Sequence, residues 1–289
     1  MKVLVLGATG YVGAAVADHL ADAGHEVVEL SRTARPERPR QQRIADLADP
    51  RALTAAVTAD IDAVVHAATP TGDAGTDAAA VDALTAPLRG TGRPFLYTSG
   101  IWVLGPTGSD PVDETTPTNP IPIVGYRPAI ERQALAAHEH GVRSIVIRPG
   151  IVHGRGGGIP ALLVDLARQH GAPRYVGDKQ VRWPAVHVDD LADLFVLALE
   201  RAPGGSIWHG VAEPAVSVVD LAAAAGSAAG LTASPQAWPV EQASAALGAP
   251  FAAALALSQH ISGDLARDKL AWKPDRVDAV TDLRAGSYR

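Results

Sequence analysis

Short apolar runs and segments with helical spacing alternate along the first half of the chain. Continuous apolar runs are typical of strands buried on both faces of a sheet. They predict strands over residues 3–6, 27–30, 43–45, 63–66, 95–98 and 144–147. Apolar residues at helical spacing predict helices over residues 14–23, 51–57, 77–88 and 127–140. Because these elements alternate with short connections, we predict an α/β fold with a doubly wound parallel sheet covered by helices on both faces.

The alternation becomes irregular after residue 148. The predicted elements are a flexible Gly-Arg-Gly-Gly-Gly loop over residues 154–158, helices over 162–169 and 189–200, and a strand over 207–209. Asp189 or Asp190 is the expected cap of the second helix. From residue 216 the chain is rich in alanine and predicted helical, with proline and glycine breaks. We expect a main domain of residues 1–150, completed by 186–210, and a smaller C-terminal lobe of residues 151–185 and 211–289.

A glycine-rich segment lies directly between the first predicted strand and the first predicted helix. Its sequence is Gly7-Ala8-Thr9-Gly10-Tyr11-Val12-Gly13. Gly7 permits a tight turn, Gly10 lets the backbone approach a pyrophosphate, and Gly13 lets the helix pack closely on the strand. The N–H groups and the positive dipole end of the helix would face the phosphates. We therefore interpret residues 1–150 as a dinucleotide-binding domain and the C-terminal lobe as substrate-binding. The cofactor residues of this segment are Gly7, Thr9, Gly10, Tyr11, Val12 and Gly13.

The end of the second predicted strand indicates which dinucleotide binds. An acidic side chain there would bind the adenosine ribose hydroxyls of NAD. This chain instead has Ser31 and Arg32, followed by Arg35 and Arg38. A hydroxyl and a guanidinium suit the 2′-phosphate of NADP, which a carboxylate would repel. We expect NADP(H) as the preferred cofactor, bound at Ser31 and Arg32, with NAD(H) as the alternative.

Composition removes several other functions. The 289 residues include no cysteine, which excludes a disulfide framework, a thiol nucleophile and a zinc–thiolate site. The formal net charge of −6 argues against nucleic-acid binding, which needs clustered lysine and arginine. His138 and His140 would point to different sides of a helix, so we expect no metal site. The first apolar run ends at Gly7 and no stretch is long enough to span a bilayer, so we expect a cytoplasmic protein without membrane contact.

Six motifs in this order resemble the short-chain dehydrogenase/reductase superfamily, above all its extended or atypical branch of NAD(P)-dependent epimerases, dehydratases and reductases. Besides the glycine segment they are Asp46-Leu47, Val65-His66-Ala67-Ala68, Tyr97-Thr98-Ser99-Gly100, Arg148-Pro149-Gly150-Ile151-Val152 and Val186-His187-Val188-Asp189-Asp190-Leu191-Ala192. The resemblance covers nearly the whole chain and implies a Rossmann fold. The motifs fall at the carboxyl ends of parallel strands, where open α/β sheets bind ligands.

The resemblance also implies a role for each motif. The residues expected around the cofactor are Asp46 and Leu47 at the adenine, Ala67 and Ala68 after the fourth strand, Thr98 and Ser99 near the nicotinamide, and Pro149, Gly150 and Val152 beside its ribose and amide. His66 is expected to be a packed imidazole at a strand end. His187 is expected to be structural, tying its loop to the helix that follows.

The usual catalytic residues of this superfamily are missing. They are Ser or Thr, a Tyr, and a Lys four residues later whose charge lowers the pKa of the Tyr hydroxyl. If Tyr126 is the family tyrosine, Ile130 occupies the Lys position. If Glu131 matches the acidic residue that follows the lysine, Arg127 occupies the Lys position and Ile123 the Tyr position. We prefer the second alignment because it places the following Arg-Pro-Gly motif at the better distance.

The remaining polar residues give three catalytic candidates, Tyr126, Arg127 and Ser99. Arg127 can hydrogen-bond a ribose, but a guanidinium stays protonated and cannot act as an acid near neutral pH. Tyr126 is a candidate replacement acid, or else an aromatic residue packed at a helix start. Tyr97 and His153 are weaker candidates. Gly100 stands at the usual Ser position, so the standard proton relay is absent or rebuilt.

We hypothesise an NADP-dependent oxidoreductase that transfers hydride to or from a small organic carbonyl, imine or enone. Two alternatives stay open: a non-redox isomerase, epimerase, dehydratase or cyclase on the same scaffold, or a non-catalytic dinucleotide-binding protein. The expected partner is a small-molecule substrate, and a homodimer is the candidate assembly because dimers are common in the superfamily. Four tryptophans could line the substrate cavity, although a core position is the default. They are Trp183, Trp208, Trp238 and Trp272.

Overall fold

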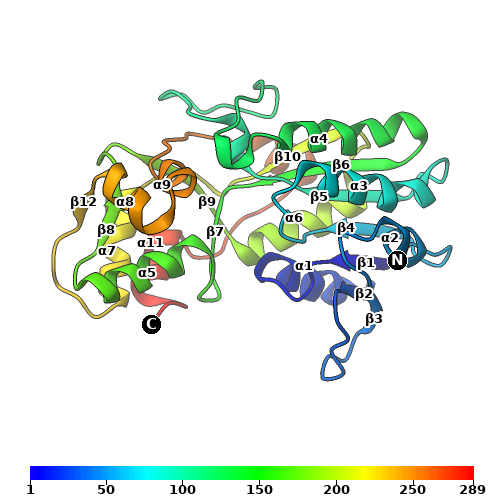
Figure 1. Ribbon diagram of the computed structural model, residues 1–289, viewed down its shortest axis with the longest axis horizontal. Helices are drawn as coiled ribbons and strands as arrows, with labels where there is room; N and C mark the ends of the chain where they lie inside the picture. Colours follow the sequence, from blue (N-terminus) through cyan, green and yellow to red (C-terminus); the bar gives the residue numbers. More distant parts are fainter.

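A seven-stranded parallel sheet forms the centre of the computed structural model, which describes residues 1–289 (Figure 1). The strand order is β10-β6-β5-β4-β1-β2-β3, and every neighbouring pair is parallel. The bounds are β1 (Lys2–Leu6), β2 (Glu26–Ser31), β3 (Gln41–Ile44), β4 (Ala63–His66), β5 (Pro94–Thr98), β6 (Arg143–Pro149) and β10 (Ser206–Gly210). The order reverses between β1 and β4, and such sheets bind ligands outside the carboxyl ends of the strands at that point.

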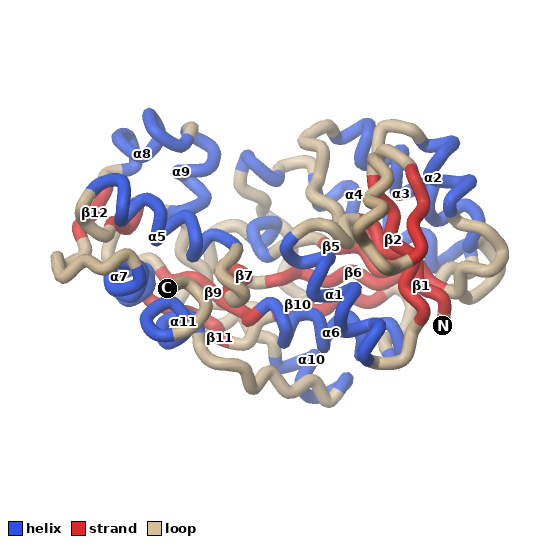
Figure 2. Tube along the Cα trace, turned by 90° about the horizontal axis from the view of Figure 1, so that it is seen from below, coloured by secondary structure: helices blue, strands red, loops and turns tan.

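Helices cover both faces of the sheet (Figure 2). One face carries α1 (Tyr11–Asp22), α6 (Val188–Arg201) and α10 (Asp264–Leu270); the other carries α2 (Pro50–Ala56), α3 (Ala74–Thr85) and α4 (Arg127–Ala136). Side chains alternate along a strand, so β1 sends Val3 and Val5 into one core and Leu4 and Leu6 into the other. This double burial explains why the strands read as continuous apolar runs.

The C-terminal lobe lies beyond one end of the sheet, at the left of Figure 1, and has a core of its own. Its strands are β7 (Ile151–His153), β8 (Arg174–Val176), β9 (Arg182–His187), β11 (Glu213–Ser217) and β12 (Gln236–Trp238). Its helices are α5 (Gly158–His170), α7 (Val218–Ala228), α8 (Val240–Leu247), α9 (Ala249–Leu255) and α11 (Ala279–Ala285). None of the helices has the length and apolar character needed to cross a membrane.

The predicted fold class is confirmed, whereas the predicted cap of the helix over residues 189–200 is wrong. His187, not Asp189 or Asp190, caps α6, because its Nδ1 accepts a hydrogen bond from the Asp189 N–H at 3.2 Å. Both aspartates lie in the first turn of α6, where a negative charge interacts favourably with the positive end of the helix dipole. The helix predicted over residues 127–140 is α-helical only to Ala136 and ends in a 3₁₀ turn, as helix C-termini often do.

Candidate cofactor and substrate site

The glycine segment makes the predicted turn between β1 and α1. Gly7 has φ +79°, and a Cβ there would overlap the backbone of Ala67 and Ala68 just after β4. A Cβ on Gly13 would overlap the carbonyl of Gly7, so only glycine lets α1 approach the strand this closely. Gly10 precedes α1 without a side-chain cap. The N–H groups of the first helical turn are therefore open to phosphate oxygens.

A cavity of about 340 Å³ opens where the carboxyl ends of β5 and β6 meet the C-terminal lobe. Ligand pockets start at about this size. The side toward the sheet is formed by residues that the sequence predicts at the cofactor. They are Tyr11, Val12, Thr98, Ser99, Arg127, Pro149, Gly150 and Val152. The structure thus gathers residues from three of the six motifs, together with Arg127, around one cavity.

Arg127 is the only charged side chain that lines this cavity. Its Nη2 donates to the Thr98 carbonyl at 2.6 Å and to the Tyr97 hydroxyl at 3.3 Å, with the guanidinium over the Tyr97 ring. Thr98 Oγ1, Ser99 Oγ and Arg127 Nε are buried and have no hydrogen-bond partner. Unpartnered buried polar groups are rare in proteins. At a cavity wall they suit ligand atoms, and these residues fit the ribose and amide of a nicotinamide dinucleotide.

Tyr126 lies outside the cavity. Its hydroxyl donates to Asp77 Oδ2 at 2.7 Å, and burial together with this carboxylate raises the pKa of Tyr126 to about 12. Asp77 also accepts from the backbone and hydroxyl of Thr71, so the pair ties the start of α4 to the loop before α3. The structure therefore brings Ser99 and Arg127 together and keeps Tyr126 apart, in the structural role that the sequence left open for it.

The position of Arg127 agrees with the alignment that gives it the Lys position. Ile123, at the Tyr position, is 37% exposed, and Gly100 lines the cavity at the usual Ser position. Tyr97 is buried beneath Arg127 and does not line the cavity, and burial raises the pKa of its hydroxyl. Tyr11 does line the cavity, but its hydroxyl donates to the Gly154 carbonyl at 2.8 Å. No side chain in the cavity wall is thus placed as a free acid.

The residues predicted at the adenosine end follow β2 and β3. Ser31 Oγ donates to the Thr33 carbonyl, and the Arg32 side chain is exposed. Arg38 reaches back to the glycine turn, where it donates to the Ala8 carbonyl at 3.3 Å. It also pairs at 2.7 Å with Glu29, a buried carboxylate of β2. Arginine side chains therefore lie at the end of β2, and the carboxylate of Glu29 is paired with one of them, Arg38.

The adenine contacts of Asp46 and Leu47 stay predictions. Asp46 is exposed, and its Oδ1 accepts from the Ala48 N–H at 2.8 Å, as in a turn. Leu47 packs against the core under α2 and α3. Both residues follow β3, at the edge of the sheet to which an adenine would extend from the glycine turn.

The far wall of the cavity consists of residues that the sequence did not single out. They are Ile101, Trp102, Val103, Val124 and Ile159. The four named tryptophans are all in the core, so Trp102 is the tryptophan that faces the cavity. Its place two residues after the Thr98-Ser99-Gly100 segment is a signal that could have identified it.

The loop of residues 154–158, which the sequence predicts to be flexible, is held by hydrogen bonds from two tyrosines. The Tyr11 hydroxyl of α1 donates to the Gly154 carbonyl. Tyr288 accepts from the Gly154 N–H and donates to the Gly157 carbonyl, both at 2.8 Å. Both tyrosines lie more than a hundred residues away along the chain, which is why the local sequence does not reveal the contacts.

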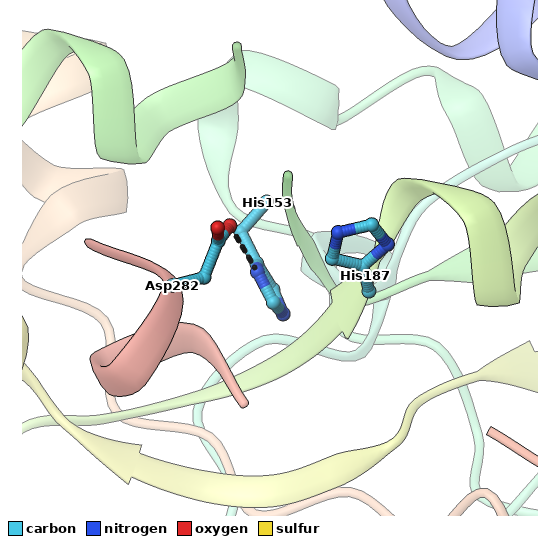
Figure 3. Close-up of side chains that lie close together, drawn as sticks. All are labelled: His153, His187 and Asp282. Carbon is cyan, nitrogen blue, oxygen red and sulfur yellow. Dashed lines mark hydrogen bonds and ion pairs between the residues drawn. The ribbon is translucent and has the colours of Figure 1, made fainter. Parts of the chain in front are cut away.

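His153, directly before this loop, forms a compact cluster of buried side chains with His187 and Asp282 (Figure 3). His153 Nδ1 lies 3.2 Å from Asp282 Oδ2, and the His187 ring stands edge-on to His153 at 5.1 Å. Their ligand atoms all lie within 4.8 Å of one another, although the sequence predicts no metal site. Each side chain already has a hydrogen-bond partner in the protein, since His187 caps α6 and Asp282 bonds His153. The cluster fastens α11 to the strands that carry the cavity.

Comparison with known proteins agrees with this architecture. The model of the NAD dependent epimerase/dehydratase family matches residues 3–209. Uncharacterized protein C2A9.02 of Schizosaccharomyces pombe is 33% identical, covering 100% of both chains. The 2-alkyl-3-oxoalkanoate reductase of Stenotrophomonas maltophilia is 31% identical, covering 71% of this chain and 68% of its own. The structure of human epimerase family protein SDR39U1 with NADPH is 22% identical and superposes with a TM-score of 0.80, covering 99% of each chain.

The family match spans most of the chain and includes the glycine turn, the Thr98-Ser99-Gly100 segment and the strands that carry the cavity. The resemblance drawn from the motifs is therefore confirmed, and the chain belongs to the NAD dependent epimerase/dehydratase family, in the extended branch of the short-chain dehydrogenase/reductase superfamily.

Proposed function

We propose that this protein is an NADP(H)-dependent oxidoreductase that transfers hydride to or from a small organic carbonyl, imine or enone. The observation that carries the proposal is the cavity at the ends of β5 and β6, with the unpartnered polar atoms of Thr98, Ser99 and Arg127 on one side. One relative is called a reductase, which supports hydride transfer, and one solved structure of the same fold contains NADPH, which supports the cofactor.

The residues around the cavity divide into two roles. A bound nicotinamide would supply or accept the hydride. Arg127 would hold its ribose, and the segment from Pro149 to Val152 would lie along its ring and amide. Ser99 would donate a hydrogen bond to the substrate oxygen, where negative charge develops during reduction.

The preference for NADPH rests on the charges after β2. Arg32 is exposed beside the strand end, Arg38 lies against the glycine turn, and Glu29 is buried and paired. A 2′-phosphate would meet guanidinium groups there, and guanidinium binds phosphate with charge-assisted hydrogen bonds.

Thermal unfolding with each cofactor tests the proposal. Ligand that binds only the folded state at about 100 times its Kd stabilises it by roughly 2.7 kcal/mol. We expect a clear rise of Tm with NADPH, a smaller one with NADH, and net oxidation of NADPH with at least one compound of a carbonyl, imine and enone panel. The absence of a shift with either cofactor would refute the proposal. Cofactor that copurifies and is recycled without net oxidation would favour an epimerase or dehydratase instead.

The substitution Arg32→Glu tests the cofactor preference. Hydrogen bonds to charged groups contribute about 1.5–3 kcal/mol, and every 1.4 kcal/mol changes an affinity about tenfold. We expect the Kd for NADPH to rise about 10- to 100-fold, with little change for NADH, in fluorescence titrations of both cofactors. Lys273→Glu, at an exposed lysine after α10, makes the same charge change and should alter neither affinity. Equal losses for NADPH and NADH would contradict a 2′-phosphate contact.

A further inference from the structure

The wall of the cavity opposite the glycine turn is apolar and fixed. Ile101 and Val103 are buried to 2% and 1% exposure in η2 (Ile101–Leu104). Trp102 packs edge-on against Phe251 of α9 with ring centroids 6.4 Å apart, so the C-terminal lobe holds the indole in place. A ligand group beside the nicotinamide position would therefore be surrounded by hydrocarbon.

The cavity offers no second cation for an anionic substrate. Arg127 is the one charged residue of the cavity wall, and its Nη2 already donates hydrogen bonds to the Thr98 carbonyl and the Tyr97 hydroxyl. Arg182 of β9 turns to the carbonyls of Lys179 and Val181, each at 3.2 Å, and does not line the cavity. Phosphates and carboxylates are bound in proteins by arginine or lysine. A nucleotide sugar, with its diphosphate, is therefore a poor match.

The cavity also lacks a side chain that could protonate an alkoxide. The hydroxyls of Thr98 and Ser99 can donate hydrogen bonds but are not acids, and Gly100 carries no hydroxyl. The Tyr11 hydroxyl donates to the Gly154 carbonyl, and Tyr126 lies outside the cavity. Reduction of an isolated carbonyl produces a strongly basic alkoxide and depends on a positioned acid. Hydride addition to the β-carbon of a conjugated enone produces an enolate, whose oxygen is a much weaker base than an alkoxide oxygen because the negative charge is shared with the α-carbon. A single hydrogen-bond donor can stabilise an enolate oxygen, and water can deliver the proton.

The apolar wall, the lack of a second cation and the lack of an acid together point to one substrate class. The inference rests on the proposed function, which it narrows. We infer that the substrate is a small, uncharged, largely apolar enone or enal whose C=C bond, not its C=O bond, is reduced. The β-carbon gains hydride from the reduced nicotinamide, and the π electrons of the C=C bond move toward the carbonyl to form the enolate. Ser99 Oγ donates to the enolate oxygen, and a proton from water adds to the α-carbon. The two electrons that the alkene gains in this step would come from a reduced nicotinamide bound at the site.

Matched ring ketones test this inference. The purified protein is incubated with NADPH and either 2-cyclohexen-1-one or cyclohexanone, and products are identified by gas chromatography with mass spectrometry. We expect the enone to give cyclohexanone, with a kcat/KM at least about tenfold above that for reduction of cyclohexanone itself. We also expect ligand-observed NMR to detect binding of cyclohexanone to the protein with NADP⁺, and UDP-glucose not to displace it.

Three results would overturn the inference: formation of 2-cyclohexen-1-ol, faster reduction of the saturated ketone, or displacement by UDP-glucose. NADPH that stabilises the protein without turnover of either ketone overturns it as well, and leaves cofactor binding intact. Failure of the proposed function has a different signature, since NADPH would then not stabilise the protein and no compound of the wider panel would oxidise it.

The variant Val124→Arg tests the apolar wall directly. Val124 is half-buried at the cavity, so an arginine can fit there while adding charge to the substrate side. We expect kcat/KM for 2-cyclohexen-1-one to fall at least about tenfold and cyclohexanone binding to weaken, with the Kd for NADPH nearly unchanged. Val277→Arg, at a valine that is 42% exposed and outside the cavity wall, is the matched control and should change neither. Unchanged enone kinetics in Val124→Arg would overturn the placement of the substrate.

Discussion

Ser99 and Arg127 lie at the same cavity but are held in different ways. Arg127 is fixed by the Thr98 carbonyl and the Tyr97 ring, so its remaining donors are directed by the protein before any ligand arrives. Ser99 is positioned through its backbone N–H, which donates to the Ile147 carbonyl of β6 at 2.8 Å, and its hydroxyl stays unpartnered. The two residues can therefore be tested separately, Arg127 for cofactor binding and Ser99 for the chemical step.

Replacement of Ser99 by alanine should slow turnover without weakening cofactor binding. Loss of one hydrogen-bond donor to a developing oxyanion typically lowers kcat about 10²- to 10³-fold. Steady-state kinetics on the best substrate and an NADPH titration would check both effects. Ser227→Ala removes a hydroxyl from the exposed side of α7 and should leave both values unchanged. A Ser99→Ala enzyme with wild-type kcat would contradict the role of this hydroxyl.

Replacement of Arg127 by alanine should mainly weaken cofactor binding. Charge-assisted hydrogen bonds of about 1.5–3 kcal/mol correspond to a Kd for NADPH that is about 10- to 100-fold higher. Arg132 lies on the same helix, is exposed, and serves as the control when changed to alanine. Isothermal titration calorimetry of both variants measures the difference. Equal affinities in the two variants would show that Arg127 does not touch the cofactor.

At the scale of elements, the loop of residues 154–158 connects the start of α1 to the segment after α11. The Tyr11 ring leaves no room for a Cβ on Gly157, and Tyr288 ties both ends of the loop by hydrogen bonds. Burial raises the pKa of Tyr288 to about 12, so its hydroxyl stays protonated and can donate throughout the physiological range. The C-terminal lobe thus sets the position of one wall of the cofactor site.

The variant Tyr288→Phe removes both of these hydrogen bonds and keeps the ring. Net contributions of about 0.5–1.5 kcal/mol per bond predict a loss of about 1–3 kcal/mol in the free energy of unfolding. Because the freed loop lies on Tyr11, we also expect a higher KM for NADPH with a nearly constant kcat. Tyr175→Phe is the control, since Tyr175 is half-buried in β8, away from this loop. Urea unfolding and steady-state kinetics report the two effects, and a variant that lost stability with an unchanged KM would leave the loop a purely structural role.

At the scale of the whole molecule, two buried histidines should make the fold sensitive to acid. Burial lowers the pKa of both His66 and His209 to about 4, with Arg127 adding to the effect at His66 and Arg148 at His209. Between the ordinary pKa of 6.5 and about 4, the unfolded chain takes up protons that the folded chain does not. Their contribution is fully present above pH 6.5 and is lost as the pH falls toward 4, by roughly 3 kcal/mol for each histidine.

Urea unfolding at several pH values between 4.5 and 7.5 measures this dependence. The variant His209→Gln should show a shallower fall of the free energy of unfolding on acidification, because glutamine does not titrate there. His140→Gln, at an exposed histidine, should follow the wild-type curve. Identical slopes in wild type and His209→Gln would contradict the assignment.

The fold could be predicted from the sequence because its signals are local. Buried strands need apolar residues in succession, and residues 63–66 form β4 within the predicted bounds. The glycine turn needs Gly7 and Gly13 at positions where a Cβ would overlap the neighbouring backbone. The motifs then follow in an order that fixes the family. Each of these features is determined within a few residues, so no distant contact is needed to recognise it.

Only the tertiary structure decided which of the catalytic candidates face the cavity and which residues form its far wall. Tyr126 and Arg127 are adjacent in sequence, yet one donates to Asp77 of α3 and the other to the end of β5. Trp102 faces the cavity because Phe251 of a distant helix supports it. The loop before α5 is held by Tyr288 at the far end of the chain. A side chain's direction depends on the partner it meets across the fold, and these partners are brought together only when strands and helices from both halves of the chain pack.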